Sequence, residues 1–352
     1  MQLEFNLNFF VIFSLISFIV SFLIVKNSNL FFSGSLLDKD FIKPQAFHTE
    51  PTARIGGFII LSLFFLFIFF YFSAFNIFLK DYFTVTLLLF FLGFLDDLKI
   101  KINPNIRLFL MLIILIICIN AFSIQINKSG LDFLNQWLQN NIFQTCFVLL
   151  CFLFVINGSN LIDGFNGLLA IHFLLITFIL IGVNYLNQNE NMIIILSSQI
   201  IIVFTFLIFN FPKAKIFLGD SGSYLLGSLI VLNVIKTHQL NSEISPFFYA
   251  SILFYLFYEV FFSFTRKAVK KKSPLYPDKL HLHMLVYKFL LNSTRFKNSN
   301  YTTSYLINIV YLILIFPTIY FQDNGVIIRY YFFLQILFYT LIYYFFSNSK
   351  NK

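Results

Sequence analysis

The chain has 352 residues, of which 59% are hydrophobic and 11% charged, and its formal net charge is +9 at pH 7. Soluble domains carry about a quarter of charged residues, so this composition excludes an ordinary soluble protein. The cysteines, Cys118, Cys146 and Cys151, lie in apolar stretches without metal-ligand spacing, which indicates buried thiols and no disulfide framework.

Apolar runs near the roughly 20 residues that a helix needs to cross a bilayer recur along the whole sequence. We therefore expect an all-α, polytopic membrane protein with about eleven transmembrane helices, built as one membrane domain over residues 1–352. The first run follows Glu4 rather than a basic region, so we expect a retained helix. The runs lie near residues 7–25, 56–79, 82–95, 106–126, 143–162, 165–184, 191–209, 216–235, 246–264, 305–321 and 326–346.

The basic residues are distributed unevenly between the loops that join these runs. All but four of the 24 Lys and Arg fall in the odd-numbered loops or after the last run. The four exceptions are Lys80, Lys128, Lys236 and Arg329. Because cytoplasmic loops are enriched in Lys and Arg, we expect the N-terminus outside (periplasmic) and the C-terminus in the cytoplasm. The longest polar segment, about 265–304, is predicted to be a cytoplasmic loop.

Two polar motifs lie early on the lysine-rich side. HTEPTARIGG at 48–57 places Arg54 before a glycine pair, and GFLDD at 93–97 ends an apolar run on Asp96 and Asp97. Adjacent carboxylates at a helix C-terminus oppose the macrodipole and each other. A cation such as Mg²⁺, held by hard oxygen ligands, would offset them. The alternative for the first motif is a basic loop with a glycine turn. The alternative for the second motif is a solvated acidic cap of the helix.

The third motif, NGSNLIDGFNG at 157–167, carries a polar residue at every third position. On a helix this spacing places Asn157, Asn160, Asp163 and Asn166 on one ridge. Polar side chains near a membrane boundary are candidates for function. A helix-packing face is the alternative.

Two further motifs follow on the same side. KAKIFLGDSGS at 213–223 places Asp220 between glycines and serines just inside an apolar run, where an unpaired carboxylate would cost several kcal/mol. A divalent ion or a basic partner is the expected compensation. The last motif runs from the basic residues at 266–272 to His281 and His283. Such a basic run favours contact with anionic lipid, and the histidines could bind phosphate or transfer protons.

Taken in this order over residues 48–283, the motifs resemble those of the polyprenyl-phosphate N-acetylhexosamine-1-phosphate transferases, the MraY/WecA family. The resemblance implies an enzyme of the bacterial inner (plasma) membrane with its active site on the cytoplasmic face. Such an enzyme transfers an N-acetylhexosamine 1-phosphate from a UDP-sugar to polyprenyl (undecaprenyl) phosphate and releases UMP. It implies Mg²⁺ as cofactor, with Mn²⁺ as an alternative, and UDP-N-acetylhexosamine, polyprenyl phosphate and membrane lipid as partners. No nucleic acid is expected, and a homodimer is compatible with the sequence.

The resemblance also implies roles for single residues. Asp96, Asp97, His281 and His283 are expected to be catalytic, and Asp220 is expected to bind the metal together with Asn166. The expected substrate-binding residues are Arg54, Asn160, Asp163, Asn166, Phe217, Arg266 and Lys267.

Three positions depart from the family pattern. Asn166 replaces the second aspartate of DGxDG, and Met284 replaces the last histidine of HxHH. Glu259 stands where an aspartate is common, a variant that resembles members initiating O-antigen. We therefore expect this protein to initiate an O-antigen-like cell-envelope polysaccharide.

A transporter or lipid flippase is the chief alternative, because proton-coupled carriers also contain many helices and buried aspartates. Alternating access would require polar residues on both sides of the membrane midplane, and the even-numbered loops lack them. A binding or scaffold protein is a third possibility, against which Asp220 and the acidic pair argue.

Overall fold

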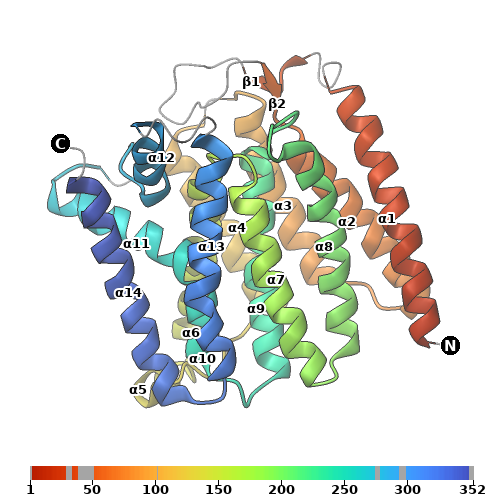
Figure 1. Ribbon diagram of the computed structural model, residues 1–352. Coiled ribbons are helices and arrows are strands. Elements are labelled where there is room, and N and C mark those ends of the chain that lie inside the picture. Colours follow the sequence, from red (N-terminus) through yellow and green to blue (C-terminus); the bar gives the residue numbers. More distant parts are fainter. Residues whose placement is uncertain are drawn as a thin grey trace.

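The computed structural model describes residues 2–28, 34–38, 51–100, 102–273, 278–292 and 299–348. Long helices run between two ends of a bundle, with the strands and α12 at one end and α5 at the other (Figure 1). The helices are α1 (Gln2–Lys26), α2 (Gly56–Phe75), α3 (Lys80–Asp97), α4 (Pro104–Ala121), α5 (Asp132–Trp137), α6 (Asn141–Ile162), α7 (Leu168–Leu186), α8 (Glu190–Asn210), α9 (Gly219–Leu240), α10 (Pro246–Ile252), α11 (Phe254–Val269), α12 (Leu282–Asn292), α13 (Ser299–Tyr320) and α14 (Gly325–Asn348).

Several helices begin at side chains that satisfy their first backbone N–H groups. Asn103, Asn140 and Ser245 accept such bonds at the starts of α4, α6 and α10. Pro104 and Pro246 then occupy the first turns of α4 and α10, where a missing N–H does no harm. Local sequence therefore sets these boundaries, and the apolar runs supply the length.

The predicted apolar runs all coincide with helices, and fewer than the expected eleven meet a criterion of length and composition for a membrane span. Eight helices among the described residues meet that criterion, or nine if α10 and α11, which meet at a bend of 71°, form one broken span. Among the helices that correspond to the predicted runs, α3 and α9 fall short of the criterion. Nearly every residue of α9 from Gly219 to His238 is buried. A helix surrounded by protein does not need an apolar surface facing lipid, so its sequence can be more polar.

The all-α prediction requires one addition. Strand β1 (Leu37–Asp38) pairs antiparallel with β2 (Thr52–Ala53), and Ala53 forms a parallel bridge to Ile216. Within the predicted loop at 265–304, α11 continues to Val269 and α12 forms a further helix. His48 of the first motif lies outside the described residues.

Glycines allow α2 and α3 to pack very closely on the start of α9. A Cβ atom on Gly57 would lie 2.4 Å from the backbone N of Gly222. A Cβ atom on Gly93 would lie 2.5 Å from the carbonyl O of Asp220. No side chain fits at either position without moving the backbone of α9, so these glycines fix the place of Asp220.

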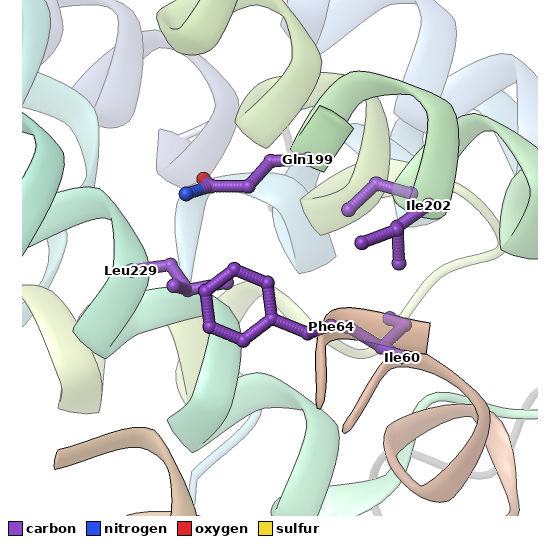
Figure 2. A pocket seen from close by; sticks show the side chains of 6 residues that line it. Ile60, Phe64, Gln199, Ile202 and Leu229 are labelled. Carbon is purple, nitrogen blue, oxygen red and sulfur yellow. The ribbon is translucent and has the colours of Figure 1, made fainter. Parts of the chain in front are cut away.

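The interior between α2, α8 and α9 is filled. Gln199 and Asn233 exchange hydrogen bonds of 3.2 and 2.6 Å, and the Tyr82 hydroxyl donates to Asn233 at 2.8 Å. The remaining gap is too narrow for a water molecule, so it is a packing defect rather than a binding site. Figure 2 shows its lining, which consists of Ile60, Phe64, Gln199, Ile202, Val203 and Leu229.

Candidate active site

Ends of α3, α4, α6 and α9 meet and bring together polar residues that are far apart in the sequence. Asp96 and Asp97 end α3, Arg107 lies in the first turn of α4, Asn160 lies in the last turn of α6, and Asp220 lies in the first turn of α9. Direct contacts link them. We call these five residues the aspartate cluster.

Asp97 is buried and caps the N-terminus of α9. Its Oδ1 accepts a hydrogen bond from the Asp220 N–H at 3.0 Å. Its Oδ2 accepts from the N–H and hydroxyl of Ser221 at 2.9 and 2.6 Å. The first N–H groups of a helix have no partners within the helix, and a carboxylate there is favoured by the dipole. Asp97 therefore holds the backbone that carries Asp220.

Gly219 makes this cap geometrically feasible. Its φ is +79°, and a Cβ atom there would lie 2.6 Å from Asp97 Oδ2. Glycine adopts such positive φ values without steric penalty. The LGDS sequence thus combines a turn that only glycine suits with the carboxylate of Asp220 immediately after it.

Asp96 and Asp220 point to a common place, which Arg107 occupies. The Arg107 Nη1 contacts Asp96 Oδ2 and lies 3.4 Å from Asp220 Oδ2. The Asn160 amide donates to Asp220 Oδ1 at 3.2 Å and to Ser223 at 3.0 Å. The side chains of Asp96 and Asp220 are 17% and 28% exposed, whereas that of Asp97 is 0% exposed. These two carboxylates are therefore the accessible ones.

The oxygen-bearing side chains at this site are of the type that binds Mg²⁺. Mg²⁺ is usually held by one or two carboxylates together with substrate phosphates, and it keeps several positions for water. Asp96 and Asp220 supply two convergent carboxylates, and Asn160 adds an amide beside them. Within the described ranges no group of three or more His, Cys, Asp or Glu could hold a metal. Two carboxylates with an amide beside them suit a cation whose remaining ligands are substrate phosphates and water.

Arg54 and Asp163 lie within electrostatic reach of the cluster. Arg54 pairs with Asp38 at 2.6 Å, and its Nη1 lies 3.7 Å from Asp97 Oδ1. Asp163 directly follows α6, and burial, together with the negative charge of Asp220, raises its pKa well above the usual value. The structure therefore brings residues from each of the first four motifs to one site, namely Arg54, Asp96, Asp97, Asn160, Asp163 and Asp220.

Phe217 and Asn166 lie in the connections that frame the site. Phe217 forms backbone hydrogen bonds to Ala53 and Gly56, and its half-buried ring lies just before α9. The amide of Asn166 donates to the Pro212 carbonyl at 3.0 Å, and the hydrogen bonds of Asn166 do not reach Asp220. The expected role of Asn166 at the metal therefore stays a prediction.

Three residues of the last motif, Arg266, Asp278 and His281, form a second group with Glu259 and Tyr339, which we call the histidine cluster. The His281 Nδ1 lies 3.0 Å from Glu259, and its Nε2 lies 3.4 Å from Asp278. Tyr339 donates to Glu259 at 2.5 Å, and Arg266 pairs with Asp278 at 2.9 Å. His281 is therefore held between two acidic side chains, and the cluster joins α11 and α14 to the segment before α12.

His283 and Lys267 are both buried beside this cluster. Burial lowers the pKa of His283 to about 3, so its ring is neutral near pH 7. The ring packs edge-on against Phe165 at 5.8 Å between centroids, and its Nδ1 lies 3.4 Å from the Tyr255 hydroxyl. Phe165 belongs to the loop that follows Asp163, so His283 links the histidine cluster to the third motif.

Sequence reasoning missed Arg107 and Asp38. The position of Arg107 in the sequence is one signal that could have identified it. A cation in the first turn of a helix is disfavoured by the helix dipole, which indicates an acidic partner. No sequence signal identifies Asp38, because its pairing with Arg54 depends on the register of β1 with β2.

Removing the Tyr339 hydroxyl should loosen the histidine cluster. We expect Tyr339→Phe to lower stability by about 1.5 kcal/mol, the low end for a hydrogen bond to a charged group. The measurement is the thermal unfolding midpoint in detergent micelles. Tyr330→Phe on the same helix, where the side chain is 73% exposed, is the matched control. Equal midpoints for the two variants would contradict the proposed bond.

Comparisons with known proteins show similarity over part of the chain. Residues 79–238 match the family model described as Glycosyl transferase family 4. An undecaprenyl-phosphate alpha-N-acetylglucosaminyl 1-phosphate transferase of Thermotoga maritima is 29% identical over 58% of this chain and 60% of that protein. A probable undecaprenyl-phosphate N-acetylglucosaminyl 1-phosphate transferase of Bacillus subtilis is 27% identical over 57% and 56%. A phospho-N-acetylmuramoyl-pentapeptide-transferase of Dictyoglomus turgidum is 28% identical over 75% and 86%.

The chain thus spans less than two thirds of the length of the first two relatives. The matched range nevertheless contains the whole aspartate cluster, from Asp96 to Asp220. Residues 79–238 are thus similar to glycosyl transferase family 4, and the relatives are similar to this chain at 27–29% identity.

Proposed function

We propose that this protein transfers N-acetylglucosamine 1-phosphate, or a related N-acetylhexosamine 1-phosphate, from a UDP-sugar to undecaprenyl phosphate. The observation that carries the proposal is the convergence of Asp96 and Asp220 on one cation position beside the N-terminus of α9. The named activities of the Thermotoga maritima and Bacillus subtilis relatives support N-acetylglucosamine as the sugar. We further propose that the product initiates an O-antigen-like polysaccharide, which the Glu259 variant supports.

The reaction needs placement and charge neutralisation more than covalent help. An oxygen of the lipid phosphate attacks the phosphorus attached to the sugar, the bond from that phosphorus to the UMP oxygen breaks, and UMP leaves. The acceptor is already largely anionic at neutral pH, because the second pKa of a phosphate monoester is about 6. A strong general base is therefore unnecessary, and direct attack is sufficient.

The residues of the aspartate cluster divide the work. Asp220 and Asp96 would hold Mg²⁺, or Mn²⁺ in its place, and the ion would neutralise the phosphate oxygens. Asn160 orients Asp220 through its amide, and Asp97 fixes the backbone of α9. Arg54 adds positive charge beside them. Phe217 offers a ring for the uracil, and Arg266 and Lys267 are proposed to contact the donor.

We place the aspartate cluster on the cytoplasmic face of the bacterial inner membrane. The loops that surround it carry the lysine-rich sequences, including Lys99, Lys213 and Lys215, as the positive-inside rule requires. A UDP-sugar is soluble, and a polyprenyl phosphate carries its headgroup at the membrane surface. A site at the end of the bundle can therefore reach both substrates.

UMP release tests the proposal directly. Protein in detergent micelles is incubated with undecaprenyl phosphate, Mg²⁺ and one donor at a time from UDP-N-acetylglucosamine, UDP-N-acetylgalactosamine and UDP-N-acetylmuramoyl-pentapeptide. We expect UMP from an N-acetylhexosamine donor, no UMP after chelation, and recovery when Mg²⁺ or Mn²⁺ is added back. No UMP from any donor, with transport of lipid or solute in proteoliposomes, would support the transporter instead.

A further inference from the structure

Arg107 occupies an unusual place for a cation. It lies in the first turn of α4, whose partial positive charge disfavours it. Its guanidinium extends to both accessible carboxylates of the aspartate cluster and lies 5.9 Å from the centroid of the Tyr224 ring. No motif recognised in the sequence contains Arg107.

The other charges around the site have partners of their own. Asp97 accepts its hydrogen bonds from the start of α9, and Arg54 directs two of its nitrogens to Asp38 at 3.0 and 2.6 Å. Among the described residues, Arg107 is the cation that contacts both Asp96 and Asp220, and the charge of Arg54 also acts on Asp220. Two carboxylates that converge on one position without a cation between them would repel each other.

We propose that Arg107 is a resident cation that holds the metal position in the metal-free protein and is displaced when a divalent ion binds. This inference rests on the proposed function, because it takes Asp96 and Asp220 as the metal ligands. The same carboxylate oxygens serve the guanidinium in one state and the ion in the other. Arg107 thus keeps the two ligands together before the ion arrives, and it lowers the affinity for the free ion.

The displacement follows from charge and shape. A divalent ion brings twice the charge of a guanidinium to the same oxygens, and the long arginine side chain can rotate away without moving α4. Removing the charge of Arg107 removes both its competition for the ligands and its repulsion of the ion. Lysine keeps the charge, so it should keep much of the competition.

The test measures binding of Mn²⁺ alone to the full chain in detergent micelles, by the paramagnetic resonance signal of the free ion. We expect Arg107→Gln to bind Mn²⁺ roughly tenfold more tightly than the unaltered protein. Arg107→Lys should stay near the unaltered protein, and adding Asp220→Asn to Arg107→Gln should abolish the gain. Equal or weaker binding by Arg107→Gln, or no binding by any variant, would overturn the proposal.

A second measurement needs no variant and so does not depend on the folding of Arg107→Gln. Phenylglyoxal modifies accessible arginines, and peptide mass spectrometry follows each one separately. We expect Mn²⁺ to increase the rate at Arg107 severalfold and to leave Arg329, which lies in α14 and bonds to Gly130, unchanged. An unchanged rate at Arg107 while Mn²⁺ is bound would overturn the displacement. Neither measurement uses a sugar donor, so a failed transferase assay remains a separate result.

Discussion

Asp220→Asn is expected to lower kcat/KM for UMP release by about 10²–10³-fold, the usual effect of losing one group that stabilises charge in a transition state. Asparagine has nearly the same shape, so α9 and its cap by Asp97 should remain. What is lost is one of the two carboxylates that converge at the site. The measurement is the initial rate of UMP release at saturating Mg²⁺ with purified protein.

Asp132→Asn is the matched control for this change. Asp132 is exposed in the first turn of α5, at the other end of the bundle from the strands and α12 (Figure 1). The control carries the same loss of charge and should retain full activity. If Asp220→Asn were as active as Asp132→Asn, Asp220 could not be a metal ligand, and the site would have to lie elsewhere.

The acidic pair shows how far sequence could define the site. GFLDD indicated two equivalent carboxylates, because nothing in a linear motif separates Asp96 from Asp97. The structure separates them by burial and by partner. Asp97 faces the start of α9, and Asp96 faces Arg107. Which neighbour turns inward depends on how α3 approaches α9, and that approach is set by contacts distant in sequence.

For the histidine motif, too, the sequence alone does not define the surroundings of each side chain. Sequence placed His281 and His283 near phosphates through the family resemblance. In the structure Glu259 and Asp278 flank His281, and a wholly buried environment surrounds His283. Their catalytic roles remain predictions, and Asp278 links His281 to Arg266.

The helices themselves were predictable, because an apolar run of about 20 residues has few alternatives in a membrane protein. Which of these helices face lipid was harder to predict. Hydropathy measures the cost of facing lipid, and α9 faces protein along almost its whole length. The polar residues at the start of α9 therefore indicate the site, and they do not indicate whether the helix faces lipid.

Gly93→Ala is expected to destabilise the protein by about 3 kcal/mol, the upper part of the usual range for overpacking. The new Cβ atom would lie 2.5 Å from the Asp220 carbonyl O and 2.6 Å from the Ser221 N. These are backbone atoms at the capped start of α9, so no flexible side chain can move aside. Either α3 and α9 separate or the start of α9 shifts, and Asp220 moves with it.

Activity should fall together with stability, because a displacement of about 1 Å at a reacting centre can lower a rate about 10²-fold. The two measurements are the thermal unfolding midpoint in detergent micelles and kcat for UMP release well below that midpoint. Gly182→Ala in α7 is the matched control, since a Cβ atom there meets nothing within 4 Å. It should leave the midpoint unchanged or slightly raised, because alanine favours helix over glycine. If Gly93→Ala behaved like Gly182→Ala in both measurements, the close contact of α3 with α9 would not be what positions Asp220.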